Sequence, residues 1–113
     1  MSRSWDLFLQ DMEEATLKIL RRTRGLTFET FKGDDLLYDA VVRNLETLGE
    51  AAKGIPTEIR DQLPDVDWRG VAGLRDVLSH AYFAIDDTTL WDIIQKKVPE
   101  VADQLKRFRV KKV

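Results

Sequence analysis

Apolar residues recur at steps of three and four along most of the chain, and this spacing most constrains how the chain can fold. In the clearest segment, four of them form one seam: Leu37, Val41, Leu45 and Leu48. Such spacing places side chains on one face of an α-helix. No segment shows the strict alternation of a half-buried strand, and no repeat period is visible. The sequence therefore predicts an all-α fold.

Capping residues, glycines and prolines indicate where the helices begin and end. The expected long helices run from Ser4 to Arg24, from Asp34 or Asp35 to Gly54, from Trp68 to Tyr82, and from Asp86 or Asp87 to Phe108. Two shorter helical segments are expected at Thr27–Phe31 and Pro56–Pro64.

Four residues refine this helical plan. Phe28 and Phe31 lie one helical step apart and are expected to close one end of a bundle. Asp67 is well placed to cap the third long helix. Pro99 lies inside the last apolar period, and we expect a kink or short break there because proline lacks a backbone donor and crowds the preceding turn. The prediction is a bundle of about four main helices plus one or two short helices, in a single domain over residues 1–113.

Composition narrows the classes of function. The chain has no cysteine and one histidine, His80. Disulfides and thiolate metal sites are excluded, and a zinc site would have to rely on carboxylates, so we expect no structural metal. No uninterrupted apolar region follows the N-terminus, and no stretch approaches the roughly 18 apolar residues of a membrane span. We expect a cytoplasmic protein without a membrane partner.

The charge balance limits how the chain can bind nucleic acid. Charged residues make up 34% of the sequence, yet they nearly cancel to a net charge of -2. Proteins that bind nucleic acid by bulk electrostatics usually carry a basic excess, so any contact with RNA must be local or shared with a partner subunit. Two basic clusters are interpreted as charges that offset helix dipoles and solvate a face: Arg21, Arg22 and Arg24, and Lys106, Arg107, Arg109, Lys111 and Lys112.

The helix expected from Trp68 to Tyr82 carries the only histidine and has two unlike sides. At about 100° of rotation per residue, its polar side chains share an arc of about 140°. They are Arg75, Asp76, Ser79 and His80. The apolar side chains fill the opposite arc: Val71, Leu74, Val77, Leu78 and Ala81. One face of this helix therefore concentrates a guanidinium, a carboxylate, a hydroxyl and an imidazole.

These groups are suited to cleaving RNA. The planar fork of arginine binds phosphate, and histidine titrates near neutrality, so it can take a proton from a ribose hydroxyl or give one to a leaving oxygen. Asp76 stands four residues before His80, a spacing that allows it to orient the ring. One helix supplies few groups, so a second copy across a twofold axis would make a fuller site. The same residues also have an ordinary structural interpretation, with Asp76 and His80 as a surface pair, Arg75 as a solvated charge and Tyr82 as a packing residue.

At these residues the chain resembles the HEPN superfamily, and specifically the HepT-like toxins. That family is marked by an arginine, four residues, a histidine, one residue and a tyrosine, which Arg75, His80 and Tyr82 match. Asp76 matches the polar residue that often follows the arginine. The similarity extends to four further segments, so that it covers nearly the whole chain: Asn44–Ala51, Val66–Trp68, Trp91–Ile94 and Val98–Pro99.

The resemblance implies a HEPN-type helical bundle that forms a homodimer, with a ribonuclease cleft where the two subunits meet. In such proteins the arginine and the histidine are the catalytic pair and cleavage of RNA is metal-independent. These roles fall to Arg75 and His80, and no cofactor is expected. Asp76 takes a supporting polar role, and Ser79 is expected beside it because it lies on the same face.

The resemblance also implies a partner. HepT-like toxins are commonly encoded beside a minimal nucleotidyltransferase antitoxin, in type VII-like toxin–antitoxin systems, and Tyr82 matches the tyrosine that accepts AMP from it. Phosphate charge added at the edge of the cleft would repel RNA. The expected function is thus a toxin that acts as a metal-independent endoribonuclease. The alternatives are a non-catalytic HEPN module that binds a nucleotide or protein and regulates or recruits a nucleotidyltransferase, and a helical oligomerisation domain.

Overall fold

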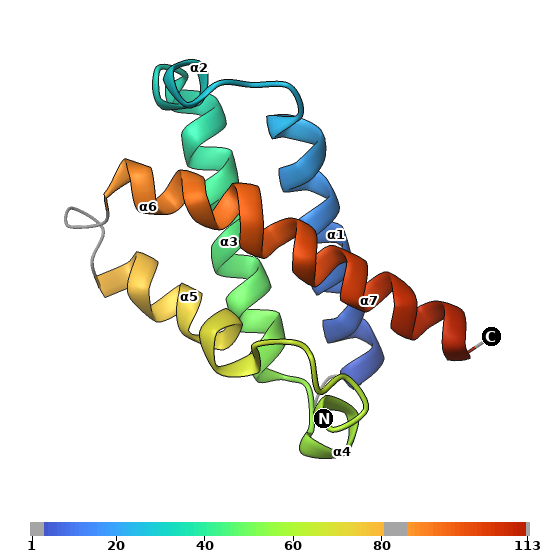
Figure 1. The fold of residues 1–113 in the computed structure, drawn as a ribbon. Helices are drawn as coiled ribbons and strands as arrows, with labels where there is room; N and C mark the ends of the chain where they lie inside the picture. Colours follow the sequence, from blue (N-terminus) through green and yellow to red (C-terminus); the bar gives the residue numbers. More distant parts are fainter. Residues whose placement is uncertain (1–3, 81–85, 113) are drawn as a thin grey trace.

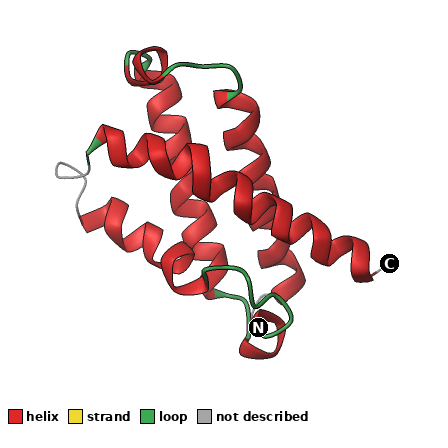
Figure 2. Cartoon of the chain, in the orientation of Figure 1, coloured by secondary structure: helices red, strands yellow, loops and turns green. Residues whose placement is uncertain are grey.

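The computed structural model describes residues 4–80 and 86–112, apart from the side chains of Val77, Ser79, His80 and residues 110–112 (Figure 1). All regular structure in this part of the chain is helical (Figure 2), so the all-α prediction is confirmed. None of these helices combines the length and the low polarity that crossing a membrane requires. In chain order they are α1 (Trp5–Thr23), α2 (Phe28–Lys32), α3 (Asp35–Lys53), α4 (Thr57–Arg60), α5 (Trp68–His80), α6 (Asp87–Asp92), a π-helical segment (Ile93–Lys97) and α7 (Val98–Lys112).

Four helices begin at the polar residues that the sequence indicated. Before α1, α3 and α6, a side-chain oxygen accepts a hydrogen bond from the first turn, at Ser4, Asp34 and Asp86. Before α5, Asp67 Oδ1 accepts from the N–H of Gly70 at 3.0 Å. That bond, helped by Lys97, lowers the pKa of the Asp67 carboxyl below its ordinary value. Each such cap stabilises its helix by about 1 kcal/mol.

The last helical stretch contains the expected break, in the form of a wide turn. Ile93–Lys97 is π-helical, and the N–H of Val98 donates to the carbonyl of Ile93, five residues back. Pro99 follows at the second position of α7, where it has no N–H to donate. A π-turn holds one residue more than an α-turn, so the regular α-helical ladder is interrupted directly before the proline.

The helix α3 lies between α1 and α5 and packs against both, while α7 crosses over α1 (Figure 1). The seam predicted on α3 is confirmed, since Val41, Leu45 and Leu48 are fully buried. Most of the remaining core comes from α1, α5, α6, the π-helical segment and α7: Leu9, Met12, Ile19, Val71, Leu74, Leu78, Leu90, Ile94, Val98, Val101, Leu105 and Phe108. On α5, Val71, Leu74 and Leu78 of the predicted apolar side are buried in this core, whereas the side chain of Val77 and residue Ala81 lie outside the description.

An aromatic cluster closes one end of the bundle, as expected for Phe31. This side chain is fully buried, and its ring lies 5.4 Å from that of Tyr38 and 5.1 Å from that of Trp91, measured between centroids. Tyr38 also donates from its hydroxyl to Asp87 Oδ1 at 2.8 Å. The cluster therefore fastens the start of α6 to α2 and α3.

Candidate functional site

A glycine lets α5 approach α3 closely at the start of the candidate site. A Cβ at Gly49 would lie 2.8 Å from the backbone nitrogen of Arg75 and 3.0 Å from the carbonyl oxygen of Val71. Both atoms belong to the backbone of α5, so they cannot turn aside as a flexible side chain would. Gly49 thus sets how near the backbone of Arg75 lies to α3.

Arg75 is held beside α3 by a single close carboxylate. Its Nε lies 3.0 Å from Glu50 Oε2, and the two side chains are 47% and 60% exposed. Asp76 Oδ1 is more distant, at 3.9 Å from Nη1. An exposed pair of this kind is worth about 0–1 kcal/mol. The guanidinium is therefore oriented but weakly bound, and it keeps further N–H donors for another anion.

Asp76 pairs with a lysine of α3. Lys53 Nζ donates to Asp76 Oδ1 at 3.2 Å, and both side chains are partly exposed. Glu50 and Lys53, one helical turn apart on α3, therefore face Arg75 and Asp76 on α5 with opposite charges. The expected orientation of the His80 ring by Asp76 stays a prediction. The structure adds an ion pair between Asp76 and Lys53.

The other predicted site residues lie at or beyond the end of α5. Ser79 and His80 are its last two residues, and their side chains fall outside the description. Tyr82 lies outside the described residues. Of the predicted set, Arg75 and Asp76 are brought together on the exposed side of α5.

A shallow cavity of about 310 Å³ opens beside Arg75. It is bounded by α1 and α3 as well as by α5, and its lining consists of Phe8, Asp11, Arg43, Glu46, Thr47, Glu50, Ala51 and Arg75. Six of these eight residues are polar or charged, and they include two arginines and three carboxylates. In the described part of the chain, no three His, Cys, Asp or Glu side chains gather in a way that could hold a metal ion.

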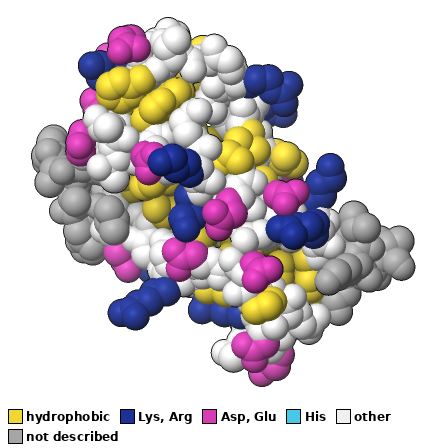
Figure 3. All heavy atoms as spheres, in the orientation of Figure 1, with side chains coloured by type: hydrophobic (Ala, Val, Ile, Leu, Met, Phe, Trp, Pro, Cys, Tyr) yellow, Lys and Arg dark blue, Asp and Glu magenta, His cyan; other side chains and the backbone are white. Residues whose placement is uncertain are grey.

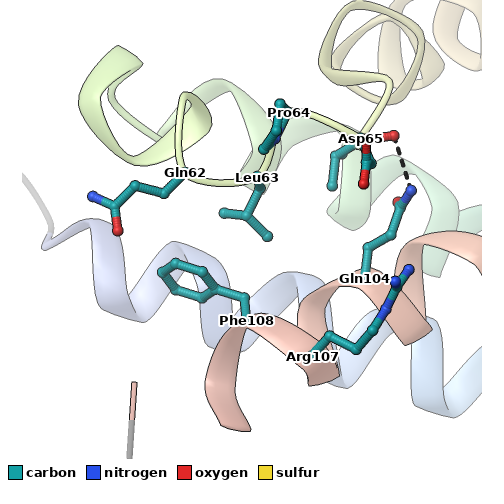
Figure 4. A pocket seen from close by; sticks show the side chains of 8 residues that line it. Gln62, Leu63, Pro64, Asp65, Gln104, Arg107 and Phe108 are labelled. Carbon is teal, nitrogen blue, oxygen red and sulfur yellow. Dashed lines mark hydrogen bonds between the residues drawn. The ribbon is translucent and has the colours of Figure 1, made fainter. Parts of the chain in front are cut away.

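A second cavity, of about 260 Å³, lies elsewhere, between the connection from α4 to α5 and the C-terminal half of α7 (Figure 4). Across it, Gln104 Nε2 donates to the carbonyl oxygen of Asp65 at 2.8 Å. Leu63 and Phe108 form its apolar floor. This arrangement ties a connection to α7 and brings none of the predicted site residues together.

One residue of the basic clusters departs from its expected role. Arg109 is not simply a solvated cation, because Nη1 lies 2.9 Å from Asp6 Oδ1 and Nη2 lies 3.1 Å from Glu13 Oε1. The hydrogen bond with Glu13 raises the pKa of Arg109 above its ordinary value, against the opposing effect of burial. Arg109 therefore ties α7 to α1. On the face formed by α6 and α7, basic and acidic side chains are interspersed (Figure 3).

Sequence reasoning missed the part of the site that α3 contributes. The sequence did carry a signal for it on α3. A glycine, Gly49, is followed directly by Glu50, and Lys53 stands three residues further on. A helix interior rarely gains from glycine, which costs about 1 kcal/mol there relative to alanine. That cost was the available signal, but it applies equally at Gly73, where an added Cβ would meet nothing within 4 Å.

Comparison with known proteins places the chain in a family. The family model described as "Ribonuclease HepT-like" matches residues 12–108. A protein of Thermococcus cleftensis named "Probable ribonuclease HepT" is 38% identical over 109 residues, covering 96% of this chain and 99% of the relative. "Putative RNase TTE0752" of Caldanaerobacter subterraneus subsp. tengcongensis is 40% identical over 90 residues, 80% of each chain. No solved structure gives a significant match to the chain. The chain belongs to the HepT-like ribonuclease family of the HEPN superfamily.

Proposed function

We propose that this protein is a metal-independent endoribonuclease whose catalytic pair is Arg75 and His80. The observation that carries the proposal is that Arg75, in a chain of the HepT-like family, is exposed and has one close carboxylate partner. The side chain of Arg75 is 47% exposed, is oriented by Glu50, and lies on the helix that ends at His80. A weakly bound guanidinium can exchange its carboxylate for a phosphate at little cost.

The reaction is a transesterification that needs no group beyond the RNA and the protein. An imidazole of His80 takes the proton from a ribose 2'-hydroxyl, and the 2'-oxygen attacks the adjacent phosphorus. The bond from phosphorus to the 5'-oxygen of the next nucleotide breaks, and that oxygen receives a proton from a protonated imidazole. Arg75 binds the charge that develops on the phosphoryl oxygens. The products are a 2',3'-cyclic phosphate and a 5'-hydroxyl.

The chemistry uses two imidazoles in different protonation states, and each chain has a single histidine. We therefore place the site at a homodimer interface, where His80 of each subunit supplies one role. Two copies of Arg75 would also concentrate positive charge that a monomer with a net charge of -2 lacks.

The biological role we propose is that of a toxin neutralised by a minimal nucleotidyltransferase antitoxin. The antitoxin transfers AMP from ATP to the hydroxyl of Tyr82, forming a phosphodiester and releasing pyrophosphate. Tyr82 lies two residues beyond the last residue of α5. Negative charge added so close to His80 would repel the RNA backbone.

The decisive experiment compares RNA cleavage by the wild-type protein and by His80→Ala, both in the presence of a chelator. The wild type should cleave and form cyclic phosphate ends, and the variant should lose at least about 10²-fold in rate, the typical contribution of acid–base catalysis. Arg107→Ala, which removes an exposed arginine of α7 that pairs with Asp103, is the matched control and should cleave normally.

Equal cleavage by the wild type and His80→Ala would overturn the ribonuclease proposal and favour a non-catalytic binding module. Three further measurements test the finer parts. Light scattering should give a dimer. Expression of the chain alone should arrest growth, and Arg75→Ala should relieve the arrest. Intact mass after incubation with ATP and the antitoxin should rise by AMP units, and Tyr82→Phe should abolish the gain.

A further inference from the structure

The cavity beside Arg75 continues into a neighbouring cavity, not described above, along the seam between α1 and α3. The second has a volume of about 320 Å³, and it shares Asp11, Arg43 and Thr47 with the first. Its remaining lining consists of Glu14, Ala15, Lys18, Arg22, Ala40 and Asn44. We call the two together the α1–α3 furrow. It leads from Arg75 toward the C-terminal end of α1.

The length of the furrow follows from helix geometry. It is lined by α3 from Ala40 to Ala51, and at about 1.5 Å of rise per residue these eleven steps span roughly 16 Å. A stacked nucleic-acid strand advances about 3.4 Å per nucleotide, so the furrow accommodates up to roughly five nucleotides. It is therefore long enough to hold a strand well beyond the phosphate at Arg75.

Three cations line the furrow beyond Arg75, and none of them is engaged in an ion pair with the described residues. Arg43 stands where the two cavities meet, and Lys18 and Arg22 lie one turn apart on α1. Within residues 4–80 and 86–112, no ion pair engages any of the three. By contrast, Lys96, Arg107 and Arg109 of the last helical stretch each have a carboxylate partner.

The other polar side chains of the furrow are partly committed. The side-chain amide nitrogen of Asn44 donates to the carbonyl oxygen of Ala40, and the hydroxyl of Thr47 donates to the carbonyl oxygen of Arg43. Four acidic residues also line the furrow and balance its four cations: Asp11, Glu14, Glu46 and Glu50. Binding there must consequently depend on contacts between individual cations and phosphates rather than on a strong basic field.

We propose that single-stranded RNA extending from the phosphate at Arg75 lies along the α1–α3 furrow, with Arg43, Lys18 and Arg22 binding successive phosphates. This inference rests on the proposed ribonuclease function and names the path of its substrate. It explains how a chain of net charge -2 holds RNA through a local line of cations. It also makes affinity depend on the length of the strand on one side of the cut.

The test measures binding of fluorescently labelled, 2'-O-methylated oligouridylates, which cannot be cleaved by attack of the 2'-hydroxyl. Short and long forms, of about four and about twelve nucleotides, are compared by anisotropy. The wild type should bind the long form more tightly. The triple variant Lys18→Gln, Arg22→Gln, Arg43→Gln should bind the long form more weakly, by about fivefold for each cation removed. The slope of log Kd against the logarithm of the salt concentration should also fall by roughly two.

Two variants control for folding and charge. Lys96→Gln with Arg107→Gln removes exposed cations from the other face and should keep the gain with length. Arg43→Lys should keep most of it as well, because an ammonium still binds phosphate as a point charge. Circular dichroism verifies that each variant is folded. A triple variant that is folded and still gains affinity with length overturns the proposal.

Cleavage of the long unmodified RNA by the wild type and by His80→Ala is measured in parallel. If His80→Ala loses cleavage while the triple variant keeps the gain with length, the furrow proposal fails and the ribonuclease proposal stands. If both proteins cleave equally while the triple variant loses the gain, the furrow stands as an RNA-binding surface and the ribonuclease proposal fails.

Discussion

Arg109 and Arg75 each pair with a carboxylate of a neighbouring helix, and they do so in opposite ways. Arg109 of α7 reaches two carboxylates of α1, at 2.9 Å and 3.1 Å, and its side chain is 35% exposed. Arg75 of α5 has one close carboxylate on α3 and is 47% exposed. The first arrangement uses most of the guanidinium within the protein. The second leaves much of it for a ligand.

The difference indicates that Arg109 stabilises the fold, and it supports the proposed phosphate-binding role of Arg75. A guanidinium with two partners loses binding energy if either is replaced, whereas one with a single exposed partner can exchange it freely. The close contact between α3 and α5 at Gly49 positions the backbone of Arg75, so its side chain need not contribute to holding the helices together.

The largest expected effect separates the two arginines by activity. Arg75→Ala should lower kcat/KM for RNA by at least about 10²-fold, the usual loss when one donor to a developing anion is removed. Its free energy of unfolding should change by less than about 1 kcal/mol. Initial rates on labelled RNA and urea unfolding measure the two quantities. Arg109→Ala should show the reverse pattern, and a larger loss of stability in Arg75→Ala than in Arg109→Ala would contradict the comparison.

The next effect concerns the contact that positions Arg75. Gly49→Ala should destabilise the protein by about 1–3 kcal/mol, because the added methyl group meets the backbone of α5. Gly73→Ala is the matched control, since a Cβ there meets nothing within 4 Å, and it should stabilise α5 by up to about 1 kcal/mol. Urea unfolding compares them. Equal stability of the two variants would show that the helices separate easily at Gly49.

A smaller loss of stability is expected when Arg109 is replaced. Arg109→Met, which keeps the packing of the stem, should lower the free energy of unfolding by about 1–2 kcal/mol. The same substitution at Arg107, whose partner Asp103 lies on the same helix at the four-residue spacing, should cost no more than about 0.5 kcal/mol. Thermal unfolding at low and high salt checks both values. A cost at Arg107 matching that at Arg109 would remove the distinction between the two kinds of ion pair.

The smallest effect depends on pH and involves the cap that starts α5. The folded-state pKa of Asp67 is lowered, mainly by the N–H of Gly70. The carboxylate therefore contributes stability above the unfolded-state pKa, near 3.9, and this contribution is lost as the pH falls through the lower folded-state value. Asp67→Ala should cost about 0.5–1 kcal/mol at pH 7, and the difference from wild type should shrink as the pH falls below about 4. A constant difference across that range would argue against a charged cap.

Local features of the fold could be predicted because their causes are local. The steps of three and four residues, the caps at Ser4, Asp34 and Asp86, and the break beside Pro99 all depend on neighbours in the sequence. The exposed position of Arg75 and Asp76 followed from the same arithmetic. The catalytic pairing of Arg75 with His80 stays a prediction.

Contacts between helices could not be predicted in this way. Glu50 meets Arg75 only because α3 and α5 pack side by side, and Glu13 meets Arg109 across 96 residues of sequence. Helix spacing identifies which face is buried, but it does not identify the partner of that face. The interpretation of Arg109 as a solvated cation was wrong for this reason.

The wide turn at Ile93–Lys97 has a consequence for which changes in length the chain tolerates. Deleting one residue there would close the turn into a regular α-helix, and would rotate α7 by about 100° relative to α6. Val101 and Leu105, both fully buried, would then turn away from their places in the core. The extra residue sets the rotation of α7 relative to α6, so the number of residues in this stretch determines which side chains of α7 face the core.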